Sequence, residues 1–91
     1  MAHLLDTNLL VRLANARDPL NPVATRAVTE LRRRGETLHL TPQTLIEFRS
    51  VATRAAALNG LGMSAPAAEV ETAGFETKFP LVPDTPAIYP A

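Results

Sequence analysis

Two carboxylates in this chain have the types and surroundings needed for metal-dependent chemistry, and Asp6 is the first. It follows the apolar pair Leu4-Leu5 and precedes Thr7 and Asn8, whose side-chain oxygens add further donors to the same turn. An acid at the carboxyl end of a strand faces the crevice where open α/β sheets hold ligands. We predict Asp6 as a metal ligand, with Thr7 and Asn8 orienting it or a bound water. Asp6 also suits a helix N-cap, because a leucine stripe follows, and the two roles are compatible.

Glu47 is the second candidate. It is the sixth residue after Thr41, a predicted helix cap, and so lies past the first turn, where the helix dipole favours a negative charge. It flanks the apolar stripe of that helix, as an ordinary boundary glutamate also would. Asp6 and Glu47, from the ends of separate elements, could converge on one divalent ion, although magnesium sites of this kind usually need further carboxylates.

The composition limits the metal and the partner. The chain contains no cysteine, so a metal would be held by oxygen donors or by His3 and His39, and Mg²⁺ or Mn²⁺ is the expected ion. Nine acidic residues balance nine basic ones, so the chain lacks the basic excess typical of strong nucleic-acid binders. The arginines at 32–34 are expected to stay solvated at the carbonyl end of a helix. Arg26, Arg49 and Arg54 are candidate contacts to a nucleic acid, and no spacing argument distinguishes them.

No apolar run approaches the roughly 20 residues needed to span a bilayer, and no basic leader precedes a long apolar stretch. We expect a cytoplasmic protein with no membrane segment.

Short apolar runs alternate with helical patterns along the chain. Strands are expected at 2–5, 37–40 and 80–83. A helix is expected around Leu9–Leu13, followed by a loop to Asn21. A second helix is expected from an Asn21 N-cap and Pro22 to Gly35, with Val23, Ala27 and Leu31 on one face. Strands that alternate with helices favour a parallel sheet, and three short strands would leave at least one edge bare.

Two further helices follow. Thr41-Pro42 caps one, whose stripe is Leu45, Phe48, Ala52 and Ala55, and Asn59-Gly60 breaks its pattern. Ser64-Ala65-Pro66 opens the next, with Ala68, Thr72, Phe75 and Phe79 on one face. Asp84 is placed to cap a last helix, for which only five residues remain after Pro86.

Three segments of the chain carry recognisable motifs. They are Leu-Leu-Asp-Thr-Asn-Leu-Leu at 4–10, Thr-Pro-Gln-Thr-Leu-Ile-Glu-Phe at 41–48 and Leu-Val-Pro-Asp-Thr-Pro at 81–86. With these motifs the chain resembles a PIN domain of the VapC-like toxin type. The resemblance covers nearly all 91 residues. It implies a three-layer α/β/α fold with a short parallel sheet. It also implies a metal-dependent ribonuclease, commonly a homodimer, that binds Mg²⁺ or Mn²⁺, cleaves RNA and is restrained by a cognate antitoxin.

By this resemblance Asp6 matches the first acid of the family and Glu47 the second, which makes both of them expected metal ligands and catalytic acids. The third and fourth acids lie beyond the helix that Asp84 begins, and Asp84 itself is expected to be a cap. We therefore expect residues 1–91 to form an incomplete PIN-like domain, truncated before the last strands, that is inactive alone and poorly stable or oligomeric. The alternatives are a catalytically inert remnant that binds an antitoxin or another partner, and a structural α/β protein without an active site.

Overall fold

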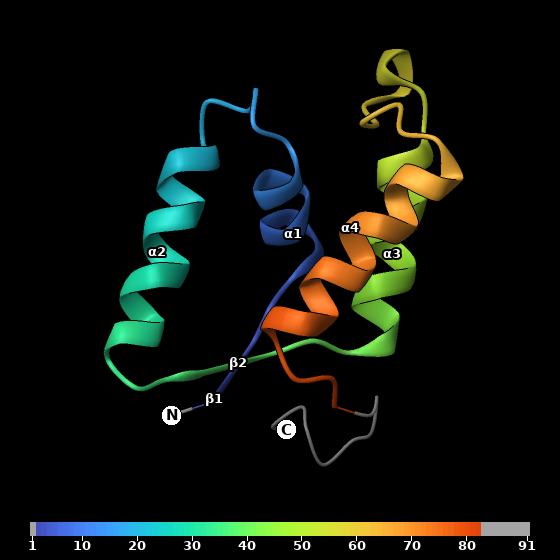
Figure 1. The fold of residues 1–91 in the computed structure, drawn as a ribbon. Helices are drawn as coiled ribbons and strands as arrows, with labels where there is room; N and C mark the ends of the chain where they lie inside the picture. Colours follow the sequence, from blue (N-terminus) through green and yellow to red (C-terminus); the bar gives the residue numbers. More distant parts are fainter. Residues whose placement is uncertain (1, 83–91) are drawn as a thin grey trace, which may run out of the picture.

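The computed structural model describes residues 2–82 and has a mixed α/β fold (Figure 1). Two short strands, β1 (Ala2–Leu4) and β2 (Thr37–His39), accompany four α-helices and one 3₁₀ turn. The helices are α1 (Thr7–Ala14), α2 (Asn21–Arg33), α3 (Pro42–Thr53) and α4 (Ala65–Lys78), and the 3₁₀ turn is η1 (Ala56–Leu58). The predicted α/β class is confirmed.

The strands pair in parallel, as the alternating pattern predicts, with Ala2 opposite Thr37 and Leu4 opposite His39. Each is shorter than expected, because Leu5 and Leu40 follow the strands instead of belonging to them. Both of these leucines are nevertheless buried. The predicted strand at 80–83 is reduced, within the described residues, to a parallel bridge between Leu40 and Leu81. Residue 83 and Asp84, the predicted cap of a last helix, lie outside the described residues.

The core cluster gathers side chains from all four helices and from β2. Helix α1 packs against both α2 and α3, and α4 packs on α3 (Figure 1). Leu10, Leu40 and Phe48 are fully buried, and the Phe48 ring meets Phe75 edge-on with centroids 5.1 Å apart. Phe75 comes from the predicted face of α4, whose members Ala68, Thr72 and Phe79 are also buried, although Phe79 follows the last helical residue. The packing of α3 against α1 and α4 fixes where the polar side of α3 lies relative to the end of β1.

The predicted N-cap at Asn21 is wrong. Asn21 is the first residue of α2, and Leu20 occupies the cap position without a side-chain hydrogen bond. The Asn21 amide instead donates to the carbonyls of Arg12, at 2.7 Å, and Leu13, at 3.3 Å. It therefore supplies hydrogen bonds to backbone carbonyls at the C-terminal end of α1. The sequence of residues 21–24 alone cannot reveal this contact.

The buried face of α2 also differs from the predicted face. Val23 is 52% exposed and Ala27 is exposed, whereas Ala24 and Val28 are buried and Leu31 is partly buried against the core. The buried positions thus shift by one residue over the first two turns of α2, from Val23 and Ala27 to Ala24 and Val28.

The caps of the other helices agree with the sequence. Thr41 and Ser64 accept hydrogen bonds from Thr44 and Ala67. Gly35, at φ 79°, ends α2 in the left-handed conformation that glycine adopts without a steric penalty. Helix α3 ends at Thr53, so Ala55 lies beyond it and is exposed. Among the helices of residues 2–82, none combines the length and apolar character needed to cross a membrane.

Candidate metal and phosphate site

Asp6 occupies the turn between β1 and α1. Its backbone is extended, with φ −91° and ψ 165°, and Oδ1 accepts a 2.7 Å hydrogen bond from the Leu9 amide. Asp6 is therefore the N-cap of α1, as the leucine stripe after it predicts. A carboxylate has two oxygens, so the cap leaves Oδ2 for an ion, and the residue is exposed to solvent.

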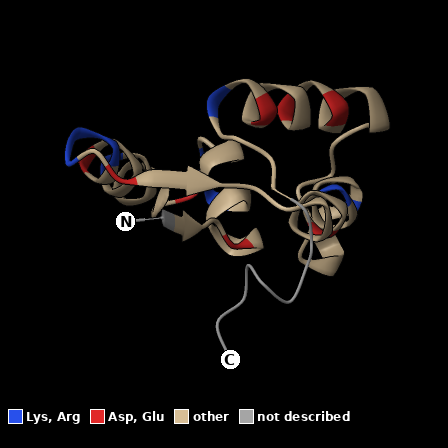
Figure 2. Ribbon diagram, turned by 90° about the horizontal axis from the view of Figure 1, so that it is seen from below, with Lys and Arg blue, Asp and Glu red and all other residues tan. Residues whose placement is uncertain are grey.

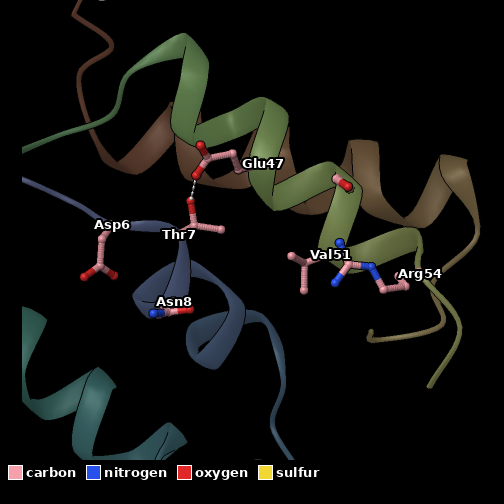
Figure 3. A pocket seen from close by; sticks show the side chains of 7 residues that line it. Asp6, Thr7, Asn8, Glu47, Val51 and Arg54 are labelled. Atoms are coloured by element: carbon pink, nitrogen blue, oxygen red, sulfur yellow. Dashed lines mark hydrogen bonds between the residues drawn. The ribbon is translucent and has the colours of Figure 1, made fainter. Parts of the chain in front are cut away.

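Glu47 lies on the exposed side of α3, between the buried residues Leu45 and Phe48. Its Oε2 accepts a 2.7 Å hydrogen bond from Thr7 Oγ1, and its Oε1 accepts a 3.0 Å bond from Gln43 Nε2. The Thr7 contact joins the first residue of α1 to the middle of α3. The fold thus places the two predicted acids near one another, with Thr7 between them (Figure 3).

A cavity of about 450 Å³ connects these residues. Thr7 and Glu47 point toward one another in its lining, and α3 continues from Glu47 toward Arg54 (Figure 3). The lining residues are Asp6, Thr7, Asn8, Glu47, Ser50, Val51 and Arg54. Ser50, Val51 and Arg54 follow Glu47 at positions i+3, i+4 and i+7, the spacing of one helix face. Ser50 and Val51 were missed in the sequence, and this spacing is the signal that could have found them.

The side chains at the cavity offer the type of ligand that a hard divalent cation prefers, but too few of them are acids. The two carboxylates, the Thr7 hydroxyl and the Asn8 amide oxygen are all oxygen donors, which Mg²⁺ and Mn²⁺ prefer. Between residues 2 and 82, however, no group of three or more His, Cys, Asp or Glu side chains is found that could hold a metal ion. Asp6 and Glu47 could thus hold an ion only weakly unless further acids join them.

The two histidines do not line this cavity. His3 lies on β1 and its Nε2 is 2.8 Å from Glu36 Oε1, just before β2. This hydrogen bond lowers the pKa of Glu36 below its ordinary value of about 4.5. His39 is half-buried on β2. Oxygen donors therefore remain the ligands at the cavity.

The arginines at 32–34 gather at the end of α2, as expected, and do not line the cavity (Figure 2). Arg33 and Arg34 pair with Glu30 at 3.1 and 3.2 Å. Arg32 lies over the Phe79 ring, 5.5 Å from its centroid, a contact that the sequence does not predict. These three cations are therefore engaged in surface contacts of α2.

Comparison of the chain with protein-family models, with curated proteins and with solved structures finds no match in any of the three. The functional argument accordingly depends on the cavity and its side chains.

Proposed function

We propose that this chain supplies the first two metal-ligating acids, Asp6 and Glu47, of a Mg²⁺- or Mn²⁺-dependent ribonuclease of the PIN-domain, VapC-like type. The supporting observation is the 2.7 Å hydrogen bond from Thr7 to Glu47, which brings the helix acid to the cavity that Asp6 also lines. This arrangement combines an acid at a strand end with an acid from a helix forty-one residues away.

In this proposal Asp6 and Glu47 bind the ion, Thr7 orients Glu47, and Asn8 positions a water at the mouth of the cavity. A divalent ion bound there supplies positive charge at the phosphate and makes a bound water more acidic. The Asp6 cap and the Thr7 hydrogen bond hold the two carboxylates in place before the ion arrives, which reduces the cost of ordering them.

The proposed enzyme also needs parts that residues 2–82 do not supply. Two acids provide about half the charged ligands expected, so the isolated chain should be inactive, with a rate lower by several powers of ten. In the proposed three-layer α/β/α domain, further strands lie beside β1, whose second edge has no partner strand in the described part of the chain. An RNA substrate, a cognate antitoxin and a second copy of the chain are the proposed partners.

Metal binding at the cavity is the first test. We would titrate MnCl₂ into the ¹⁵N-labelled chain and record which amide signals the paramagnetic ion broadens. The signals of Asp6, Thr7, Asn8 and Glu47 should broaden first, and Asp6→Asn or Glu47→Gln should weaken the effect. Glu76→Gln, which removes an exposed acid on α4, is the matched control and should change nothing. Broadening confined to other regions, or none at millimolar Mn²⁺, would contradict the proposal.

RNA cleavage tests the catalytic part. A labelled RNA incubated with the chain and Mn²⁺ should remain intact. Cleavage that persists in Asp6→Ala would show a different active site and would overturn the proposed one.

The second candidate function is an inert module that binds an antitoxin or another partner. It is favoured by the absence of a third acid near Asp6 and Glu47 among residues 2–82. It predicts complex formation with a partner without Mn²⁺ binding. Loss of that complex in Asp6→Asn, at unchanged stability, would instead favour the metal site.

A further inference from the structure

One cation, Arg54, shares the cavity with the two carboxylates. Several arginines in the described structure are engaged elsewhere, since Arg33 and Arg34 pair with Glu30 and Arg49 pairs with Glu69 at 2.7 Å. Within residues 2–82, no ion pair or side-chain hydrogen bond engages the Arg54 guanidinium. Its five donors are therefore available to a ligand.

The backbone of Arg54 is fixed by the loop that follows it. Arg54 is the C-cap of α3, where the chain turns to an extended conformation with φ −67° and ψ 144°. Its carbonyl accepts a 2.8 Å hydrogen bond from Gly62, and Gly60 lies directly against it. A Cβ atom on Gly60 would clash with the backbone carbonyl of Arg54. The loop thus packs tightly around the base of the one arginine that lines the cavity.

An RNA strand can approach the cavity more easily if a positive charge lies beside the two carboxylates. Each phosphate carries a negative charge, and two carboxylates on the same surface repel it. The whole chain has a net charge of zero, so no general basic field offsets that repulsion. A guanidinium at the cavity can do so locally, because its planar array of donors matches phosphate oxygens.

We infer that Arg54 binds a phosphate of the RNA strand next to the phosphate that is to be cut. This inference rests on the proposed ribonuclease function and adds a substrate-binding residue to it. Glu47 and Arg54 are seven positions apart, which corresponds to about 10 Å along a helix axis. With the backbone positions this far apart along α3, Arg54 is suited to a phosphate next to the one at the ion and less suited to the same phosphate.

The structure distinguishes Arg54 from the other two arginines that the sequence offered as RNA contacts. Arg49 is held by Glu69 on the side of α3 that faces α4. Arg26 lies on α2 and does not line the cavity. Arg26→Gln is therefore a matched control for Arg54→Gln, because both remove one charge from an exposed arginine.

The test measures binding of a fluorescein-labelled, eight-nucleotide single-stranded RNA by anisotropy, in EDTA, from 20 to 200 mM KCl. A phosphate contact to single-stranded RNA contributes about 0.7 to the slope of log affinity against log salt. Arg54→Gln should lower the slope by about that amount and weaken binding about tenfold at 20 mM KCl, because one counterion-releasing contact is lost. Arg54→Lys should keep most of the slope. Arg26→Gln should keep the wild-type slope.

Equal slopes for Arg54→Gln and Arg26→Gln would overturn the inference, as would undetectable binding by the wild-type chain at 20 mM KCl. If Arg54 serves only the carbonyl end of α3, Arg54→Gln should lower the melting temperature and leave the RNA slope unchanged, which also overturns it. Because the assay contains EDTA, its outcome is independent of metal binding by Asp6 and Glu47. The Mn²⁺ titration tests that part separately.

Discussion

Thr7 Oγ1 lies 2.7 Å from Glu47 Oε2 and donates a hydrogen bond across forty positions of the chain. Thr7 is the first residue of α1 and follows Asp6 directly, so the same turn that presents one acid also orients the other. This contact joins the end of β1 to α3 at the cavity.

Thr7→Val should weaken Mn²⁺ binding several-fold, because Glu47 loses the donor that orients it. Valine has nearly the same shape, so the fold should persist, with a stability loss of about 0.5–1 kcal/mol for one exposed hydrogen bond. Mn²⁺ line broadening measures the first effect and urea unfolding the second. Thr7→Ser restores the hydroxyl and should restore binding. Unchanged Mn²⁺ affinity in Thr7→Val would mean that Glu47 needs no help from α1.

Two substitutions at Asp6 should separate its roles as cap and ligand. Asparagine retains a side-chain oxygen for the Leu9 amide, whereas alanine retains none. Asp6→Ala should therefore lower the free energy of unfolding by about 1 kcal/mol more than Asp6→Asn. Both should lose Mn²⁺ binding at the cavity. Urea unfolding and the Mn²⁺ titration, performed on both variants, check these results. If Asp6→Asn bound Mn²⁺ as the wild type does, Asp6 would be a cap alone.

Much of the fold was predictable because its signals are local. The caps at Asp6, Thr41 and Ser64 depend on residues within one turn. Gly35 ends α2 by its own backbone conformation, which glycine adopts readily. The parallel pairing follows from the alternation of strands and helices. Asp6 and Glu47 could be proposed as site residues because each stands at a recognisable place in its own element.

The rest depends on contacts between distant segments. Asn21 has the right type for an N-cap, but the end of α1 offers it the Arg12 carbonyl. Glu47 alone resembles any boundary glutamate, and its hydrogen bond with Thr7, forty positions earlier, is what joins it to the turn that carries Asp6. Arg54 could not be singled out, because its position depends on α3 ending at Thr53 and on the loop that folds back to it.

The contact between His3 and Glu36 should make the free energy of unfolding depend on pH in the acidic range. The hydrogen bond from His3 is the main cause of the lowered pKa of Glu36 in the folded chain. Between this lowered pKa and the ordinary value of about 4.5, the folded state therefore binds fewer protons than the unfolded state. The stabilisation is present above that pH and is lost as the pH falls through the folded pKa.

Glu36→Gln should therefore be less stable than the wild type at pH 6, and the difference should shrink toward pH 3. The effect should be small, because both side chains reach solvent. Urea unfolding at half-unit steps of pH measures it, with Glu76→Gln as a control for the loss of an acid elsewhere. A difference that stays constant from pH 6 to pH 3 would show that the contact with His3 does not depend on the Glu36 charge.

Gly60 should tolerate no side chain, because a Cβ atom there would overlap the Arg54 backbone. Gly60→Ala should lower the free energy of unfolding by about 2 kcal/mol, the usual scale for an overpacked site. Gly74, within α4, is the matched control, since nothing lies within 4 Å of an added Cβ. Gly74→Ala should raise stability by about 0.5–1 kcal/mol, because alanine favours a helix.

The two glycine variants also bear on the RNA contact. If the loop around Gly60 positions Arg54, Gly60→Ala should reduce the salt dependence of RNA binding as Arg54→Gln does, at a temperature where the variant is still folded. Gly74→Ala should leave that dependence unchanged. A Gly60→Ala variant with lower stability and a wild-type salt slope would show that the loop supports the fold without setting the position of the guanidinium.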